Sequence, residues 1–421
     1  MSRPPATVRQ EWSAGWPVVI ASLFGFALPT IYVYSVGSLI APLEVEFGWT
    51  RAQISSGLSV VTLMGAILSP FVGVLIDRIG PRRIALPGAL LLCGSFGIIS
   101  LANGSLWQWW LLWFLLVFVA AGLKPVVWSL SVASTFEKGR GFALAVALSG
   151  SGLGLAVMPL LSIWIIDNYG WRAAPPLLGL IVGVVVVPIL YFGLHSGADA
   201  ASKARRSGSD KVQPAKAGVD ARTALLSGRF FRLAVASFLA TVTGVGLGTN
   251  YVPVLTDLGL DRSEAAATAG LAGIASIIGR LATGVLLDRY RANLVGDICV
   301  LLPLISCFLL LSSTVTIPIA MIAVFLFGCA LGAEIDIIAY LTAEQFGTAR
   351  YGTIFGVIAG LWSLATAIGP LAISYVYDVT GSYDLVIWLI IPAIVVTSLC
   401  LFSLRRPQDV VVHVSTAEAI A

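Results

Sequence analysis

Long apolar runs alternate with short polar breaks along the whole chain. A helix that spans a bilayer needs about 20 predominantly apolar residues, and the sequence contains twelve runs of about this length. Their expected limits are 15–40, 53–76, 83–102, 107–133, 140–166, 173–194, 230–256, 264–287, 294–313, 316–341, 352–377 and 383–404. The pattern predicts an all-α integral membrane protein with twelve transmembrane helices.

One polar break is much longer than the others. It runs from 196 to 228 and is rich in small, charged and flexible residues, as linkers are. We therefore expect two six-helix halves, at 1–195 and 229–406, joined by this cytoplasmic linker and followed by a cytoplasmic tail at 407–421.

Composition supports the membrane assignment. Hydrophobic residues make up 58% of the 421 positions and charged residues 11%, with a mean hydropathy of +0.95. Soluble globular domains carry about 25% charged residues. The net charge of +4 needs no nucleic acid to explain it, because the positive residues are distributed as a membrane topology requires. The first apolar run lacks a cleavage pattern and is expected to stay in the membrane.

Enzyme chemistry is not expected. The five cysteines lie in apolar runs without the paired spacing of metal ligands, and the chain has only two histidines. We find no nucleophile with a base, no catalytic residues, no metal site and no cofactor motif.

Lysine and arginine predict the orientation. If both termini are cytoplasmic, nearly all of these residues fall on the cytoplasmic side, and the opposite side holds only Arg51, Arg172 and Arg262. This is the positive-inside distribution. We expect a multi-pass protein of the cell's inner (plasma) membrane, with both termini in the cytoplasm and no large soluble partner. We expect it to be monomeric.

The two halves repeat. Gly73 to Arg78 reads Gly-Val-Leu-Ile-Asp-Arg and Gly284 to Arg289 reads Gly-Val-Leu-Leu-Asp-Arg, at an offset of 284 − 73 = 211 residues. Parallel repeats of this kind place a substrate site between the halves near the middle of the bilayer. The halves are therefore expected to be pseudo-symmetric around a central cavity.

The first copy continues as Ile79-Gly80-Pro81-Arg82-Arg83. Here the chain resembles the major facilitator superfamily, whose loop between the second and third helices carries this signature. The copies depart from it at Pro81 and at Tyr290. In that superfamily the loop controls gating, which implies gating roles for Gly73, Asp77, Arg78, Gly80, Arg83, Gly284, Asp288 and Arg289. The alternative is a simple cytoplasmic turn with a cluster of positive charge.

Apart from these loops, four ionisable groups stand out within the apolar runs: Lys124, Arg280, Glu334 and Asp336. A charge in hydrocarbon is costly, so each is a candidate functional residue. Arg280 lies eight residues before Asp288, and Asp336 eight before Glu344, or about 12 Å of helix in each case. The two are therefore level and could pair. The four formal charges sum to zero.

The repeat assigns further roles. Position 124 + 211 = 335 lies between the two acids, so Lys124 and the acidic pair occupy equivalent places in the two halves. Arg280 binds an anionic substrate, or it locks the eighth helix to the tenth through Asp336. Lys124 touches substrate, or it neutralises Glu334. The two acids cannot share one helix face.

A narrower resemblance appears at several segments. Gly15–Leu28, Phe136–Gly154 and Gly170–Ala174 resemble the monocarboxylate porter family, and Gly332–Gly347 resembles a stretch of bacterial organic-anion members. An arginine of the eighth helix binds the carboxylate in that family, and the oxalate–formate antiporters use a basic residue there, which implies this role for Arg280.

The chain departs from that family at two positions. Ser276 replaces the acid one turn before the arginine, and Tyr34 falls near the place of the lysine of the first helix. The eleventh helix also has no lysine. Proton coupling is therefore assigned to Glu334 or Asp336. The remaining candidate substrate contacts are Tyr34, Asn250, Tyr251, Ser276 and Trp362.

These observations favour a secondary transporter. The leading hypothesis is proton symport of a small organic anion, most simply a monocarboxylate such as lactate or pyruvate, by alternating access across the bilayer. Organic-anion exchange of the oxalate–formate type and proton-coupled drug efflux are the alternatives.

Overall fold

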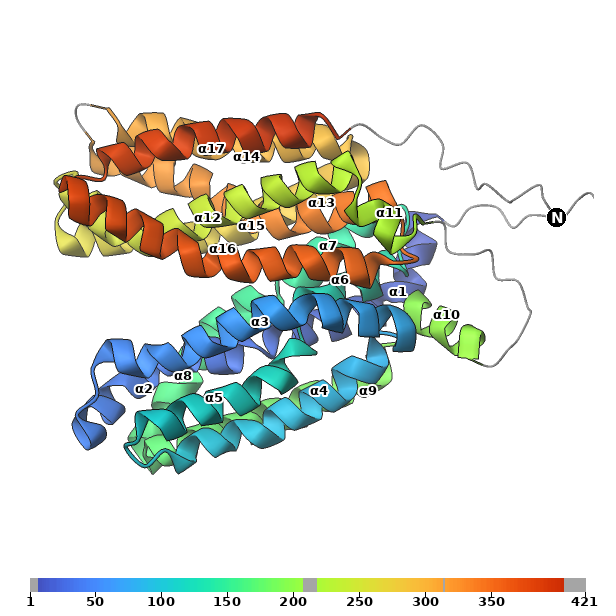
Figure 1. Cartoon of the computed structure of the whole chain (residues 1–421), viewed down its shortest axis with the longest axis horizontal. Coiled ribbons are helices and arrows are strands. Elements are labelled where there is room, and N and C mark those ends of the chain that lie inside the picture. The colour runs from blue at the N-terminus through green and yellow to red at the C-terminus, as the bar shows by residue number, and fades with distance from the viewer. Residues whose placement is uncertain (1–6, 207–217, 313–314, 405–421) are drawn as a thin grey trace, which may run out of the picture.

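The computed structural model describes residues 7–206, 218–312 and 315–404, which form helices and one isolated bridge between Gly218 and Gly347 (Figure 1). The expected tail at 407–421 and part of the linker lie outside these ranges. In the first half the elements are α1 (Val8–Ala27), α2 (Thr30–Phe47), α3 (Arg51–Ile79), α4 (Arg82–Ser95), η1 (Phe96–Leu101), α5 (Leu106–Ala121), α6 (Pro125–Ala133), α7 (Arg140–Leu148), α8 (Gly150–Tyr169), η2 (Trp171–Ala173) and α9 (Ala174–Gly193). The linker and the second half contain α10 (Gly197–Arg206), α11 (Ala221–Leu225), α12 (Gly228–Asp257), α13 (Arg262–Arg289), α14 (Ala292–Leu310), α15 (Ile317–Phe346), α16 (Tyr351–Thr380) and α17 (Asp384–Phe402).

The expected membrane architecture is confirmed. Within the described ranges, 11 helical segments are long and apolar enough to cross a membrane, and α7 with α8 makes up the twelfth. Helices α1 to α9 form one half and α12 to α17 the other (Figure 1). The halves meet mainly where α3 packs on α16 and α7 packs on α13. We call the end of the bundle that carries α10 and α11 the linker end, and the opposite end the far end.

Three of the twelve expected helices are broken. The first is split at Leu28 and Pro29, and a proline within a helix removes one backbone hydrogen bond. The fourth is split between Ala121 and Pro125, where a proline at the start of α6 fits the first helical position. The fifth is split at Ser149. The breaks before α2 and α6 thus lie beside a proline, and the break at Ser149 does not.

The first helix is also longer than its apolar run. It starts at Val8, where Thr7 and Gln10 form a capping box, and its second part ends at Gly48 in a left-handed conformation. Hydropathy detects only the stretch that lies in hydrocarbon, so the expected limits of 15 and 40 fall inside these caps.

The linker is attached to both halves. Asp199 of α10 accepts a hydrogen bond from the Arg82 amide at 2.9 Å and so caps α4, while the Ala198 amide donates to Ser134 Oγ beyond α6 at 3.0 Å. At its other end, the Val219 amide donates to the Phe346 carbonyl of α15 at 3.0 Å. Each described part of the linker thus packs on the half that it adjoins.

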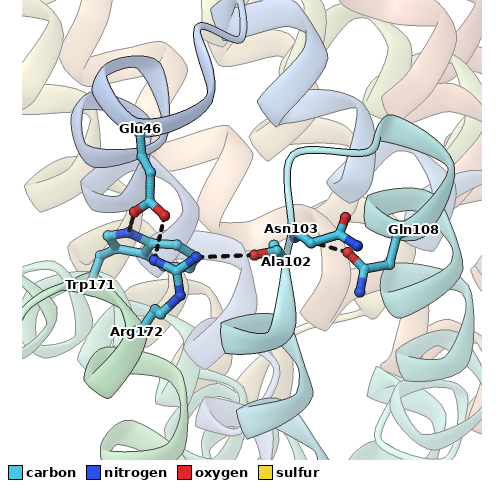
Figure 2. A network of polar contacts seen from close by, with 6 residues as sticks. All are labelled: Glu46, Ala102, Asn103, Gln108, Trp171 and Arg172. Atoms are coloured by element: carbon cyan, nitrogen blue, oxygen red, sulfur yellow. Dashed lines mark hydrogen bonds and ion pairs between the residues drawn. The ribbon is translucent and has the colours of Figure 1, made fainter.

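A polar network ties three segments together at the far end (Figure 2). Glu46 of α2 accepts hydrogen bonds from Trp171 Nε1 at 2.6 Å and from Arg172 Nη1 at 2.5 Å. Arg172 also donates to the Ala102 carbonyl at 3.3 Å and lies over the Trp171 ring. The Trp171 hydrogen bond, followed by the Arg172 contacts, lowers the pKa of Glu46.

This lowered pKa gives a pH-dependent contribution to stability. It is present in full at neutral pH and is lost as the pH falls from the ordinary glutamate value, about 4.3, through the lower folded-state value. Glu46→Gln should therefore lower the melting temperature of the purified protein at pH 7 and leave it unchanged in acid. Trp171→Phe should act in the same direction, and the double variant should add little. Equal losses at both pH values would contradict this account.

Candidate functional site

A cavity of about 600 Å³ lies between the two halves. The first half contributes α2, α3 and the breaks before α6 and α8, and the second contributes α12, α13, α15 and α16. Most of the wall is apolar. Three residues with formal charges line it: Lys124, Arg280 and Glu334. Two basic groups therefore face the cavity with one acid.

Arg280 is held by both halves. Arg280 belongs to α13, and its side chain is buried. Its Nη1 lies 3.7 Å from Asp336 Oδ1 of α15 and donates a hydrogen bond of 2.7 Å to the Leu148 carbonyl of α7. The first contact joins two helices of the second half, and the second crosses to the first half. Asp336 and Arg280 are thus level, as the helix lengths predict.

The break in the fifth helix makes the Leu148 carbonyl available. Carbonyl groups in the last turn of a helix lack partners within it, and α7 ends at Leu148. Ser151 Oγ is a second donor to this carbonyl, at 3.3 Å. An arginine with five donors can serve such a carbonyl and still face a ligand.

Asp336 is completely buried and does not line the cavity. Among the described residues neither of its carboxylate oxygens has a hydrogen-bond partner. Its contact with Arg280 is longer than a charge-assisted hydrogen bond, which is typically 2.7–2.9 Å. A buried acid of this kind acts as a counter-ion to the arginine. The contact offsets only part of the free-energy cost of burying the acid's own charge.

Lys124 occupies the break between α5 and α6, in an extended backbone conformation. Its Nζ lies against Gly65 of α3, at a point where a Cβ would be only 2.7 Å away. The ammonium group forms no ion pair or hydrogen bond within the part of the chain that the structure describes. Direct pairing of Lys124 with Glu334 is therefore not seen, and its ammonium group is available to a ligand.

Glu334 faces the cavity from α15, and its Oε1 is hydrogen-bonded to Thr241 Oγ1 of α12. Glu334 also lines a second cavity of about 40 Å³ inside the second half, beside Cys299 and Thr397. The two acids of α15 thus lie in different surroundings, as their spacing on the helix requires.

The structure places only some of the other expected substrate contacts on the cavity wall. Tyr251, Ser276 and Trp362 line the cavity, whereas Asn250 is not part of its wall and donates to the Gly246 carbonyl of its own helix at 2.9 Å. The side chain of Tyr34 lies outside the described residues, although its backbone belongs to α2.

Two carboxylates link the two halves at the linker end. Asp77 at the end of α3 accepts hydrogen bonds from the amides of Gly352 and Thr353 at 2.8 and 2.7 Å, and from Thr353 Oγ1 at 2.6 Å. These amides belong to the first turn of α16, where backbone donors are unpaired and the helix dipole favours a negative charge.

Asp288 makes the equivalent contact in the other direction. It accepts hydrogen bonds from the amides of Gly141 and Phe142 in α7, at 2.6 and 2.9 Å. The two contacts are related by the internal repeat, because 288 − 77 = 352 − 141 = 211. Each half therefore places one acid on a helix start of the other half.

Glycines allow the helix backbones to approach closely at these two contacts. A Cβ on Gly73 would lie 2.1 Å from the Gly352 carbonyl oxygen, and one on Gly284 would lie 2.5 Å from Ala145 Cβ. Gly80 has a φ of +89° and ends α3, where only glycine is free of strain. The side chains of the remaining motif residues are exposed at the linker end: Arg78, Arg83 and Arg289.

Two groups at the site, Thr241 and the Leu148 carbonyl, were not among the residues expected from the sequence. Thr241 is one threonine among many and meets Glu334 across 93 residues. The Leu148 carbonyl is a backbone group, and only the glycine- and serine-rich run that follows it indicates a weak point in the helix.

Comparison with known proteins now identifies the family. Residues 16–370 match the family model described as Major Facilitator Superfamily. The chain belongs to the major facilitator superfamily. The twelve helices, the two halves and the repeated loop are therefore features of a major facilitator transporter, and the expected fold class is confirmed.

Similar sequences come from animals and bacteria. Monocarboxylate transporter 13 of Bos taurus is 26% identical over 386 residues, which cover 88% of this chain and 84% of that protein. Monocarboxylate transporter 12 of Rattus norvegicus is 25% identical over 399 residues, covering 88% and 81%. An uncharacterized MFS-type transporter of Bacillus subtilis, YcxA, is 24% identical, covering 86% and 90%.

Solved structures share the fold. A bacterial homologue of the iron transporter ferroportin has a TM-score of 0.71 at 15% identity, covering 92% of this chain and 99% of that chain. The human organic anion transporter MFSD10 has a TM-score of 0.68 at 16% identity, covering 95% and 100%. This major facilitator protein is thus a membrane transporter and not an enzyme.

Proposed function

We propose that the protein transports a small organic anion, most simply a monocarboxylate such as lactate or pyruvate, together with a proton. Arg280 binds the carboxylate, Lys124 is a second positive contact, and a carboxyl group of α15 carries the proton. The protein works as a monomer in the cell membrane, with its linker end in the cytoplasm.

The observation that carries this proposal is the excess of positive charge around the cavity. Among the described residues Lys124 and Arg280 line it with Glu334 as the one acid, and the Lys124 ammonium group has no partner there. An ammonium and a guanidinium on an apolar wall favour a small anion with an apolar body. Arginine's planar fork matches a carboxylate in particular.

Charge balance supports coupling to one proton. With Asp336 beside Arg280, the four buried groups sum to zero when both acids are ionised. One monoanion would make the site negative, and one added proton restores neutrality. Burial of a net charge is costly, so substrate and proton are expected to cross together. The names of the monocarboxylate transporter relatives support the same substrate class.

Asp77 and Asp288 are proposed to hold the linker end closed. Their hydrogen bonds join opposite halves, so they break when the halves separate at this end. Arg280 adds a third link through the Leu148 carbonyl. A substrate carboxylate would compete with that carbonyl for the guanidinium and so weaken the closed state.

Uptake into proteoliposomes tests the coupling. Labelled lactate or pyruvate should accumulate when the outside is made acidic, and a protonophore should abolish the accumulation while leaving equilibration intact. Uptake that ignores the proton gradient but requires an anion inside the vesicle would instead show exchange.

Arg280→Lys and Arg280→Gln test the anion site. A lost hydrogen bond to a charged group is worth about 1.5–3 kcal/mol, or roughly a tenfold or greater loss of affinity. We expect KM for the acid to rise by at least this factor in both variants. Arg291→Gln, which changes an exposed arginine, should transport normally. A variant of Arg280 that melts at a lower temperature but keeps its KM would show that the arginine only locks α13 to α15.

Asp77→Asn and Asp288→Asn test the closed end. An asparagine turns an NH₂ group toward backbone donors, so each variant should lose about 1.5–3 kcal/mol of closure, a roughly tenfold shift toward opening. A cysteine at the cavity residue Ser149, in a background without the native cysteines, should then react faster with an impermeant maleimide added at the linker end. Asp199→Asn is the control, because Asp199 contacts only the linker and its own half. Unchanged labelling in both gate variants would refute the gating role.

A further inference from the structure

Two carboxyl groups of α15 are available to carry a proton, and their surroundings distinguish them. Asp336 is closed off from the cavity and faces Arg280. Glu334 lines the central cavity and forms no ion pair among the described residues. A proton that arrives through cavity water therefore reaches Glu334 first.

The partner of Glu334 is the hydroxyl of Thr241, which lies between two hydrogen-bond acceptors. Thr241 Oγ1 is hydrogen-bonded to Glu334 Oε1 and also lies 2.8 Å from the Ser237 carbonyl oxygen of its own helix. Thr241 is buried, and it is the hydrogen-bond partner of Glu334 among the described residues. A hydroxyl has one proton to donate, but here it faces two acceptor atoms.

This geometry has two complete arrangements. When Glu334 is ionised, Thr241 donates its proton to the carboxylate. When Glu334 is protonated, the carboxylic O–H donates to Thr241 Oγ1, and Thr241 turns its own hydrogen to the Ser237 carbonyl. All donors are satisfied in both arrangements. Apart from the proton on Glu334, the two differ only in the rotation of the Thr241 hydroxyl.

We propose that Glu334 is the proton carrier of this transporter and that Thr241 is its positioning residue, a hydroxyl that satisfies the acid in both protonation states. This inference deepens the proposed function and rests on its proton-coupling part. The proton comes from water in the cavity, is bound by a Glu334 carboxylate oxygen, and returns to water when the carboxylate is re-formed.

Other groups around Glu334 can influence this step. Lys124, Tyr251 and Arg280 line the same cavity from the α5–α6 break, α12 and α13, and Cys299 of α14 lines the smaller cavity. On α15 itself, Asp336 is two residues away and faces Arg280. The two cations oppose protonation of Glu334 and Asp336 favours it, so these charges partly offset one another.

Thr241→Val removes the hydroxyl and keeps the shape, and Thr241→Ser keeps the hydroxyl. A hydrogen bond to an ionised acceptor is about twice as strong as a neutral one, so the valine variant loses more in the ionised state. We expect the protonation midpoint of Glu334 to move to higher pH by about one unit, a tenfold gain in proton affinity. The serine variant should titrate like the wild type.

Infrared difference spectroscopy of the purified protein measures the protonation of Glu334 in the absence of substrate. The band of the protonated carboxyl should titrate with pH, disappear in Glu334→Gln, persist in Asp336→Asn and shift in Thr241→Val. In proteoliposomes, the net-efflux pH profile of the valine variant should shift in the same direction, while exchange at constant pH is kept.

The outcomes separate the two claims. A wild-type titration in Thr241→Val, or a titrating band that is lost in Asp336→Asn and kept in Glu334→Gln, would overturn the inference. The expected bands together with no proton-driven uptake of lactate or pyruvate would support the Thr241–Glu334 assignment and refute the proposed substrate.

Discussion

At the linker end the two halves are joined by two carboxylates that bind the starts of helices in the opposite half. Asp77 and Asp288 each accept hydrogen bonds from backbone amides in the first turn of a helix. These amides have no acceptor within their own helix. The arrangement is efficient because the same contact stabilises the charge of the acid, caps the helix and joins the halves. It also requires close backbone approach, which is why glycines occupy positions 73, 141, 284 and 352.

The proposed gate and the proposed anion site share one helix pair. Helix α13 carries Arg280 and Asp288, about 12 Å apart, and both reach α7: Asp288 at the Gly141 and Phe142 amides, Arg280 at the Leu148 carbonyl. The start of α7 thus binds an anion of α13, and its end binds a cation of α13. Each charge meets the complementary end of the helix dipole. Movement of α7 against α13 must therefore disturb the gate and the arginine together.

Much of the fold and part of the candidate site could be predicted from the sequence. Hydropathy predicted the twelve helices, and the repeat at 211 residues predicted the equivalent loops that the structure pairs with helix starts. Helix lengths predicted that Arg280 and Asp336 are level. The break at Ser149, the Leu148 carbonyl contact and the Thr241 contact could not be predicted. They depend on backbone groups and on packing between distant helices, which leave no periodic signal.

The long contact between Arg280 and Asp336 explains how an arginine can be both buried and available. A tight bidentate pair would neutralise both groups and leave little of the guanidinium for a ligand. At 3.7 Å the acid offsets part of the burial cost without occupying the donors, and a backbone carbonyl takes one of them. A carbonyl carries no full charge, so it competes less well for the guanidinium than the carboxylate of the proposed substrate would. The incomplete pairing therefore keeps the arginine ready for an anion.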